Sequence, residues 1–367
     1  MMTTLLNSGK PQYPAHFQVE RTYADHPNGT RLHYTDVTNP HVSKKGCALL
    51  LPGIFCTEVS EEVTARTFVD LGYSVRMPML RGYGIQPERS TRGSSSQFGY
   101  GKEGMIAEDL PFLVEKTNED FSQPITLLGF SSGALIAANY LSGAVAVSSR
   151  ERPYLVRDEE AARQRSQRVA KFIDLAGPHG APPLLLPHKI MLSLWSPLLA
   201  LTPAYDLRSD AFLQFVRDCM LPSHLAMTLP MQAMPMALHP MALSLGIYMN
   251  PLNITHAEFM RLMYAGLGRA EHDHMVEFMQ HLLGNGFSSE NGYDCLASAP
   301  NLHVPTSYIN GSCDRMVTPE QAKRAMDNMP AGVPRRQIVI SGRGHLDLSI
   351  GEGAYNPLTK ALSEALL

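Results

Sequence analysis

Residues 125–138 read ITLLGFSSGALIAA, an apolar run followed by a glycine-flanked serine and then by small and apolar residues. The first run predicts a buried strand and the alanine-rich run predicts a helix. Between them, residues 129–133 form a G-x-S-x-G pattern centred on Ser131. A serine on so tight a strand-to-helix turn projects its hydroxyl above the sheet, provided that its flanking residues are small. The unpaired N–H groups at the start of the helix would then face an anion that forms beside this hydroxyl.

The register of the pattern selects Ser131 as the candidate nucleophile. Gly129 and Gly133 stand two residues to either side of it, whereas Ser132 lacks a glycine two residues before it. Ser132 would instead contribute its backbone N–H. The alternative interpretation is a glycine-rich turn whose serine has no chemical role. The predicted strand before the turn and the predicted helix after it favour the catalytic interpretation, because that mechanism needs both.

Composition and charge exclude several classes of protein. The chain has 367 residues, is 44% hydrophobic and carries a formal net charge of −3, which gives no electrostatic case for binding nucleic acid or an anionic membrane surface. Its five cysteines are scattered and form no C-x-x-C pair, which favours a reduced, cytoplasmic protein. The start of the chain lacks the features of a secretory signal, and no apolar stretch is long enough to span a bilayer. We therefore expect no integral membrane association.

Strand and helix patterns alternate through the first half of the chain. Alternating polar and apolar residues at 17–23 and 30–37, joined through an Asn-Gly pair, predict a β-hairpin. The segments that follow predict an α/β fold, a mostly parallel sheet with helices on both faces. Its predicted strands are 47–51, 74–80, 125–130 and 169–176, and its predicted helices are 59–71 and 105–116. The charged stretch 148–168 predicts a solvated helix or excursion.

The character of the chain changes near Gly177. Prolines and methionines become frequent, and between 181 and 250 the charges are few and cancel. This composition predicts short, proline-interrupted helices that form an inserted cap. Strands are predicted again at 305–309 and 336–340, and a final helix is expected from about Pro357 to the end. The expected domains are an α/β core at 1–178, a helical Met/Pro-rich cap at 179–300 and the rest of the core at 301–367.

Two polar residues follow the last two predicted strands, at the sheet edge that Ser131 is expected to occupy. Asp314 follows the first of these strands and His345 follows the second. The order serine, aspartate, histidine is the one expected when a histidine base serves a serine on a strand-to-helix turn and an aspartate holds its tautomer. Each partner alone has an ordinary explanation, as a turn residue or a loop histidine. Asp174 is an alternative acid, but it precedes the end of its strand.

The chemistry also needs N–H donors for the oxyanion of the tetrahedral intermediate, and losing one typically costs roughly 3–4 kcal/mol of barrier. One predicted donor is the backbone N–H of Ser132. The second is expected from the loop after strand 47–51, where Gly53 lets the backbone turn close to the nucleophile. We expect Ile54 to supply it, with Phe55 as the less favoured alternative. Phe55 and Phe130 are the predicted substrate contacts.

With these parts, the chain resembles the α/β-hydrolase superfamily, and within it the serine esterases and lipases. The resemblance covers roughly residues 45–145 and 300–367, and the stretches 98–111 and 344–347 are similar to those of acid lipases and esterases. One departure is a Pro-Gly pair at 52–53, where many members have His-Gly.

The resemblance implies hydrolysis of a carboxylic ester through an acyl-enzyme, without a metal or an organic cofactor. It assigns Ser131 as the nucleophile, His345 as the base and Asp314 as the acid. The same fold also hosts thioesterases, C–C bond hydrolases and acyltransferases, so these stay open as alternatives. A non-catalytic protein that binds an apolar ligand is the alternative outside enzymes.

The composition of the cap bears on the substrate. A methionine-rich cap over a polar triad predicts a hydrophobic pocket and hence a hydrophobic small-molecule ester as substrate. The alternative is that the methionines simply pack the cap helices. One further pattern in the cap, at His272, His274, Glu277 and His281, resembles metal ligands at helical spacing. We interpret it as a solvated cap helix rather than a metal site.

Overall fold

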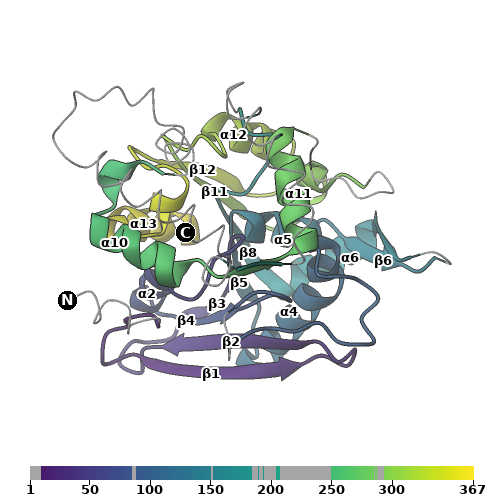
Figure 1. Ribbon diagram of the computed structural model, residues 1–367, viewed down its shortest axis with the longest axis horizontal. Helices are drawn as coiled ribbons and strands as arrows, with labels where there is room; N and C mark the ends of the chain where they lie inside the picture. The colour runs from purple at the N-terminus through teal and green to yellow at the C-terminus, as the bar shows by residue number, and fades with distance from the viewer. Residues whose placement is uncertain are drawn as a thin grey trace.

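A computed structural model describes most of the core and part of the predicted cap. The described residues are 10–84, 88–149, 152–183, 189, 193, 204–206, 249–284, 286 and 293–367. Most of the Met/Pro-rich stretch therefore lies outside the described residues. Within them, an eight-stranded sheet crosses the molecule, with helices packed on both of its sides (Figure 1).

The sheet has the order β1-β2-β4-β3-β5-β8-β11-β12 and is mostly parallel. Its strands are β1 (Gln18–Asp25), β2 (Arg31–Thr38), β3 (Gly46–Leu51), β4 (Tyr73–Pro78), β5 (Ile125–Phe130), β8 (Val169–Leu175), β11 (Thr306–Gly311) and β12 (Arg335–Ile340). Antiparallel pairing is confined to β1–β2 and β2–β4 within this sheet. The predicted α/β fold with a mostly parallel sheet and the predicted N-terminal hairpin are both confirmed.

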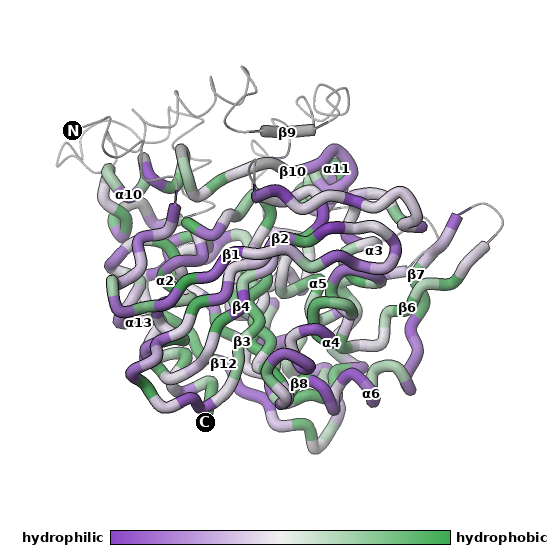
Figure 2. The backbone as a smooth tube through the Cα atoms, turned by 90° about the horizontal axis from the view of Figure 1, so that it is seen from below, coloured by the Kyte–Doolittle hydropathy of each residue, from purple (hydrophilic) through white to green (hydrophobic). Residues whose placement is uncertain are grey.

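Strand β5 lies at the centre, between β3 and β8. Its side chains alternate between two cores, as the two-residue period of a strand requires. Leu127 packs in one core with helices α4 (Leu110–Phe121) and α5 (Ser132–Leu141), and Leu128 packs in the other with α2 (Glu62–Asp70) and α13 (Glu352–Leu366). Figure 2 shows hydrophobic residues gathered along β3 and β4, while α6 (Glu159–Arg168) is strongly hydrophilic. Burial of both sheet faces explains why these strands read as continuous apolar runs.

The remaining elements surround this sheet. The helices are α2 (Glu62–Asp70), α3 (Lys102–Gly104), α4 (Leu110–Phe121), α5 (Ser132–Leu141), α6 (Glu159–Arg168), α10 (His256–Arg261), α11 (His272–Leu283), α12 (Pro319–Asp327) and α13 (Glu352–Leu366). Two π-helical segments span Met105–Asp109 and Leu262–Gly266, and short 3₁₀ turns span Pro251–Asn253, Cys295–Ala297, Ala299–Asn301 and Leu346–Leu348. Two small antiparallel pairs join β6 (Ala144–Val147) to β7 (Tyr154–Arg157) and β9 (Ala204–Asp206) to β10 (Arg269–Glu271).

Several predicted elements differ from the structure. The helix predicted at 105–116 begins as the π-helical segment Met105–Asp109 and continues as α4 to Phe121. Helix α2 begins at Glu62 rather than at residue 59, because residues 57–60 form a turn in which the Ser60 hydroxyl accepts the Thr57 N–H and donates to the Thr57 carbonyl. Helix α13 begins at Glu352, one turn before Pro357, so this proline lies inside the helix rather than at its start. The charged stretch 148–168 contains strand β7 as well as helix α6.

Candidate active site

Ser131 occupies the turn between β5 and α5, with φ +51° and ψ −118°. Such a backbone conformation is strained for a residue with a side chain and is typical of an exposed nucleophile. The Ser131 N–H donates to the Leu175 carbonyl at the end of β8, 2.9 Å away. A methyl group at Gly129 would collide with the backbone of Ala134, and one at Gly133 would collide with the carbonyl oxygens of Leu51 and Pro52. The two glycines are therefore required for this turn to close.

The structure brings Ser131, His345 and Asp314 together. The Nε2 atom of His345 lies 2.9 Å from Ser131 Oγ, and its Nδ1 atom lies 2.9 Å from Asp314 Oδ2. Both partner side chains are buried, with 4% of each residue exposed. Because the second carboxylate oxygen of Asp314 accepts the N–H groups of Met316 and Val317, both at 2.8 Å, the carboxylate is held in place.

The loop that carries His345 has its own anchor, which the sequence analysis did not identify. Asp347 is fully buried and accepts hydrogen bonds from the backbone of Gly344 and Asn250 and from the Asn253 side chain. These bonds tie the loop after β12 to the segment that precedes α10. The His345 ring also lies 5.4 Å from the Phe130 ring, centroid to centroid. The imidazole is thus fixed from both sides.

The predicted oxyanion loop lies beside the start of α5. Gly133 packs against the carbonyl groups of Leu51 and Pro52, which brings the loop after β3 next to the first turn of the helix. As the first residue of α5, Ser132 has a backbone N–H without a partner inside the helix. Ile54 follows in the same loop and is half-buried. The two predicted donors therefore come from adjacent pieces of backbone.

The two phenylalanines predicted to contact substrate have different surroundings. Phe55 is half-buried, has φ +63°, and its carbonyl accepts the N–H of Gly268 at 2.7 Å. Phe130 is 1% exposed and packs between Gly53 and the His345 ring. Phe130 therefore supports the imidazole, whereas Phe55 joins the oxyanion loop to the segment after the second π-helical turn.

A buried carboxyl beneath the same loop was missed by sequence reasoning. Glu61 is 1% exposed and its carboxyl lies near the Gly53 backbone N–H. Burial raises the pKa of Glu61 to about 8, and the Gly53 N–H offsets part of this rise. The sequence offered no signal for it, because a glutamate in a charged run ordinarily indicates a solvated surface.

Asp174, the alternative acid, contacts a different histidine. Its carboxylate lies 3.1 Å from His179 Nε2 and accepts the N–H of Gly177 at 2.7 Å. The ring of His179 packs edge-on against that of Tyr308, with centroids 5.3 Å apart. The histidine beside Ser131 is paired with Asp314.

The histidines of α11 do not lie on a solvated helix, so that prediction is wrong. His274 and His281 are 3% and 2% exposed. The Nδ1 atom of His274 lies 2.8 Å from the hydroxyl of Tyr83, and burial lowers the pKa of this histidine to about 3. Glu277 is instead paired with Lys102, at 3.2 Å. The four α11 side chains do not form a cluster of ligands.

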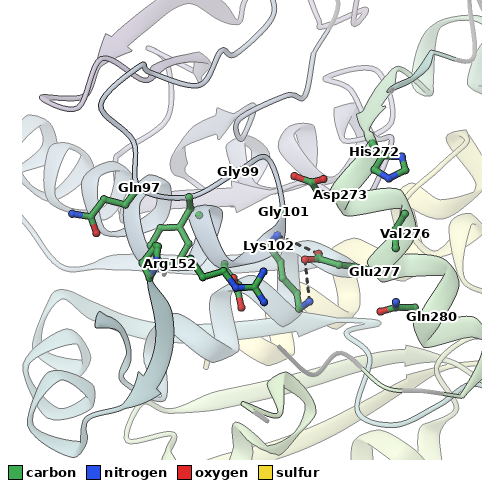
Figure 3. Close-up of a pocket in the computed structure, with 14 residues that line it drawn as sticks. Gln97, Gly99, Gly101, Lys102, Arg152, His272, Asp273, Val276, Glu277 and Gln280 are labelled. Atoms are coloured by element: carbon green, nitrogen blue, oxygen red, sulfur yellow. Dashed lines mark hydrogen bonds and ion pairs between the residues drawn. The ribbon is translucent and has the colours of Figure 1, made fainter. Parts of the chain in front are cut away.

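A polar cavity of about 400 Å³ lies between α11, the segment 97–104 that ends in α3, and the residues just before β7. Figure 3 shows Asp273 and Glu277 pointing into it from α11, with Lys102 and Arg152 opposite. Neither Ser131 nor its two partners line this cavity. Its charged walls do not match the hydrophobic pocket that the cap composition predicts, and the cap residues that would line such a pocket fall largely outside the described ranges.

Comparison with known proteins identifies the fold of the chain. No protein-family model matches the chain, and no curated protein matches it by sequence. Solved structures do match over nearly the whole chain. A bromoperoxidase from Bacillus anthracis is 16% identical, with a TM-score of 0.58, over 95% of this chain and 99% of its own. The protein has the α/β-hydrolase fold.

Two further structures with this fold are similar in extent. A soluble variant of monoglyceride lipase from Saccharomyces cerevisiae, solved with a substrate analogue, is 15% identical with a TM-score of 0.58, over 97% of this chain and 98% of its own. A thermophilic esterase from Thermogutta terrifontis is 19% identical with a TM-score of 0.54, over 95% and 98% of the two chains. At such identities the likeness establishes the fold, and the site itself has to carry any assignment of function.

Proposed function

We propose that the protein is a serine hydrolase that cleaves a carboxylic ester of a hydrophobic substrate. The observation that carries this proposal is the unbroken chain of two 2.9 Å contacts from Asp314 through His345 to Ser131. The position of Ser131 on a strained turn at a helix N-terminus also supports the proposal, because a serine without a chemical role does not need such a backbone conformation. Esterases and a lipase among the solved structures of this fold are consistent with the proposal.

The proposed reaction has two halves, acylation and deacylation, and the same side chains act in both. The Oγ atom of Ser131 attacks the ester carbonyl carbon while its proton passes to His345 Nε2, and Asp314 stabilises the resulting imidazolium through Nδ1. The N–H groups of Ser132 and Ile54 bind the oxyanion. When the tetrahedral intermediate collapses, the C–O bond to the alcohol breaks and the alcohol takes the proton from Nε2. Water then repeats these steps on the acyl-enzyme and releases the acid.

Partly exposed apolar side chains near the site support a hydrophobic substrate. Ile54 and Phe55 lie in the oxyanion loop, Leu267 is bridged to Cys56, and Leu346 follows His345; all four apolar side chains are half-buried. We also propose that residues 179–300 form a cap that completes the pocket.

The free state of Cys47, Cys56, Cys295 and Cys313 fits a reducing, cytoplasmic location. In the described ranges, no helix combines the length and apolarity needed to cross a membrane.

The experiment is a panel of p-nitrophenyl esters from acetate to decanoate, with thioester counterparts of two chain lengths. We expect kcat/KM to rise with acyl length, with esters preferred over thioesters. Ser131→Ala is expected to remove the activity, and the exposed Ser94→Ala is the matched control that retains it. Hydrolysis confined to the acetate ester would contradict a hydrophobic substrate. Hydrolysis confined to thioesters would contradict a carboxylic ester as the substrate. A well-folded protein with no activity on the panel would favour the ligand-binding alternative.

A further inference from the structure

His33, on β2, is a histidine whose ring is buried. It is 1% exposed, and neither of its ring nitrogens has a hydrogen-bond partner among the described residues. A buried polar group without a partner costs free energy, and native proteins rarely leave one unless water or an ion supplies the missing contact. The ring packs edge-on against Tyr23, with centroids 5.2 Å apart, so one edge of it remains for another partner.

Two carboxylates face this ring from separate segments. Glu58 lies in the turn between β3 and α2 and is 7% exposed, and its Oε1 atom is 4.0 Å from His33 Nδ1. Glu88 lies in the loop after β4, and its side chain is 32% exposed. One ring nitrogen and one oxygen from each carboxylate all lie within 4.8 Å of one another. Among the described residues, this is the one group of three potential metal ligands that converges so closely.

We propose that His33, Glu58 and Glu88 bind a divalent transition-metal ion, with Zn²⁺ the best fit. An imidazole nitrogen and carboxylate oxygens are ligands that zinc accepts, and the buried ring excludes an all-oxygen calcium site. Tetrahedral zinc places its ligand atoms roughly 3.4 Å apart, so the three side chains need to move by about 1 Å, with water as the fourth ligand. The ion would satisfy one orphan nitrogen of His33.

The neighbouring cations are compatible with this site. The Nε atom of Arg21 binds Glu58 Oε2 at 3.0 Å, and the Thr35 hydroxyl contacts Oε1, so one lone pair of Oε1 remains free to face His33. Hydrogen bonds of this kind orient a ligating carboxylate from outside. Lys10 lies 3.4 Å from Glu88 but is 68% exposed, so it can withdraw into solvent when a dication binds.

The site would be structural and separate from the proposed ester chemistry. It would link the β1–β2 hairpin to the turn at 57–61 and to the loop after β4. The same turn is joined to the π-helical segment Leu262–Gly266, because the Thr57 hydroxyl donates to the Ala265 carbonyl at 2.8 Å. A bound ion would therefore stabilise the folded chain in proportion to the logarithm of its concentration over its Kd.

The test is isothermal titration of chelator-treated full-length protein with ZnCl₂, together with its thermal melting curve. We expect one equivalent to bind, with a rise in Tm. His33→Gln and Glu88→Gln are each expected to weaken binding at least about 10-fold. His41→Gln, which removes an exposed histidine, is the matched control and should leave binding unchanged. Glu88→Gln decides the matter if His33→Gln does not fold, because Glu88 is partly exposed.

Two results would overturn this proposal. One is the absence of stoichiometric binding to the folded, chelator-treated wild-type protein. The other is binding that is equally strong in wild type and in Glu88→Gln, which would assign the ion to other histidines of the chain. Titration with CaCl₂ should give no comparable binding, and tighter calcium than zinc binding would also contradict the assigned ion. Hydrolase activity is not part of the readout, so failure here leaves the triad untouched.

Discussion

Two carboxylate–imidazole pairs lie at the same edge of the sheet, and they differ in what the imidazole meets next. In the first, Asp314 holds His345, whose second nitrogen lies 2.9 Å from Ser131 Oγ. In the second, Asp174 lies 3.1 Å from His179, whose ring packs against Tyr308. An acid beside a histidine therefore does not by itself indicate a catalytic pair. What distinguishes the first pair is the strained turn after β5, which presents a hydroxyl to it.

Replacing each of the two histidines should give the largest difference in kcat between the two pairs. We expect His345→Ala to lower kcat by roughly 10⁴- to 10⁶-fold, because the base of such a triad acts as a unit with its nucleophile. His179→Ala should change kcat less than about 10-fold, since no reacting atom lies beside it in this account. Steady-state ester hydrolysis measures both. Comparable losses in the two variants would contradict the distinction.

The two aspartates should show the same contrast on a smaller scale. Asp314→Asn leaves the geometry intact but favours the wrong imidazole tautomer, so we expect kcat to fall about 10⁴-fold. Asp174→Asn should instead lower stability by about 1–2 kcal/mol, because the amide is a weaker acceptor for the Gly177 N–H. Denaturant unfolding and ester hydrolysis on both variants provide the comparison. A larger kinetic loss in Asp174→Asn would make it the acid.

The loop after β3 offers a third test, since we propose that it binds the oxyanion beside the first pair only. A methyl group at Gly53 would lie 3.1 Å from the Phe130 ring and 3.2 Å from Cys56 Sγ, so these side chains or the loop must give by a few tenths of an ångström. We expect Gly53→Ala to lower kcat about 10- to 100-fold, because donors displaced by a fraction of an ångström bind the oxyanion less well. Gly180→Ala, whose added methyl meets the flexible end of Gln321, is the control. An unchanged kcat would remove this loop from the proposed oxyanion hole.

Glu61 is a third buried carboxyl, beneath the loop after β3, and burial has raised its pKa from 4.5 to about 8. Between these two pKa values Glu61 holds a proton in the folded state that it has released in the unfolded state. The free energy of unfolding therefore falls as pH rises from about 5 to 8. The expected slope is at most about 1.4 kcal/mol per pH unit. Glu61→Gln should remove this slope and be more stable than wild type at pH 8. Parallel unfolding curves for both proteins from pH 5 to 8 would contradict the assignment.

The positions that sequence analysis could predict are those fixed by local geometry or by topology. Gly129 and Gly133 are needed for one particular turn, so the turn could be read from the pentapeptide. Asp314 and His345 follow strands of a parallel sheet, whose carboxyl ends share an edge, so their convergence with Ser131 could be predicted from the order of the strands.

The features that sequence analysis missed depend on which polar groups the tertiary structure buries. Glu61 and Asp347 look like surface carboxylates in the sequence, yet they are 1% and 0% exposed. His274 lies on a helix of mixed polarity, and its buried ring bonds to and stacks on Tyr83, which is distant in the sequence. Pro357 ordinarily marks the start of a helix, and the extra turn before it follows from packing of α13 against α2.

The most direct test of the central claim is covalent labelling with a fluorophosphonate, followed by intact mass measurement and peptide mapping. The account predicts that one phosphonyl group attaches to the wild-type protein, with loss of fluoride, and that it maps to Ser131. Ser131→Ala should take up no label, while Ser94→Ala should be labelled as wild type is. A folded wild-type protein that stays unlabelled, or a label that persists in Ser131→Ala, would contradict the account.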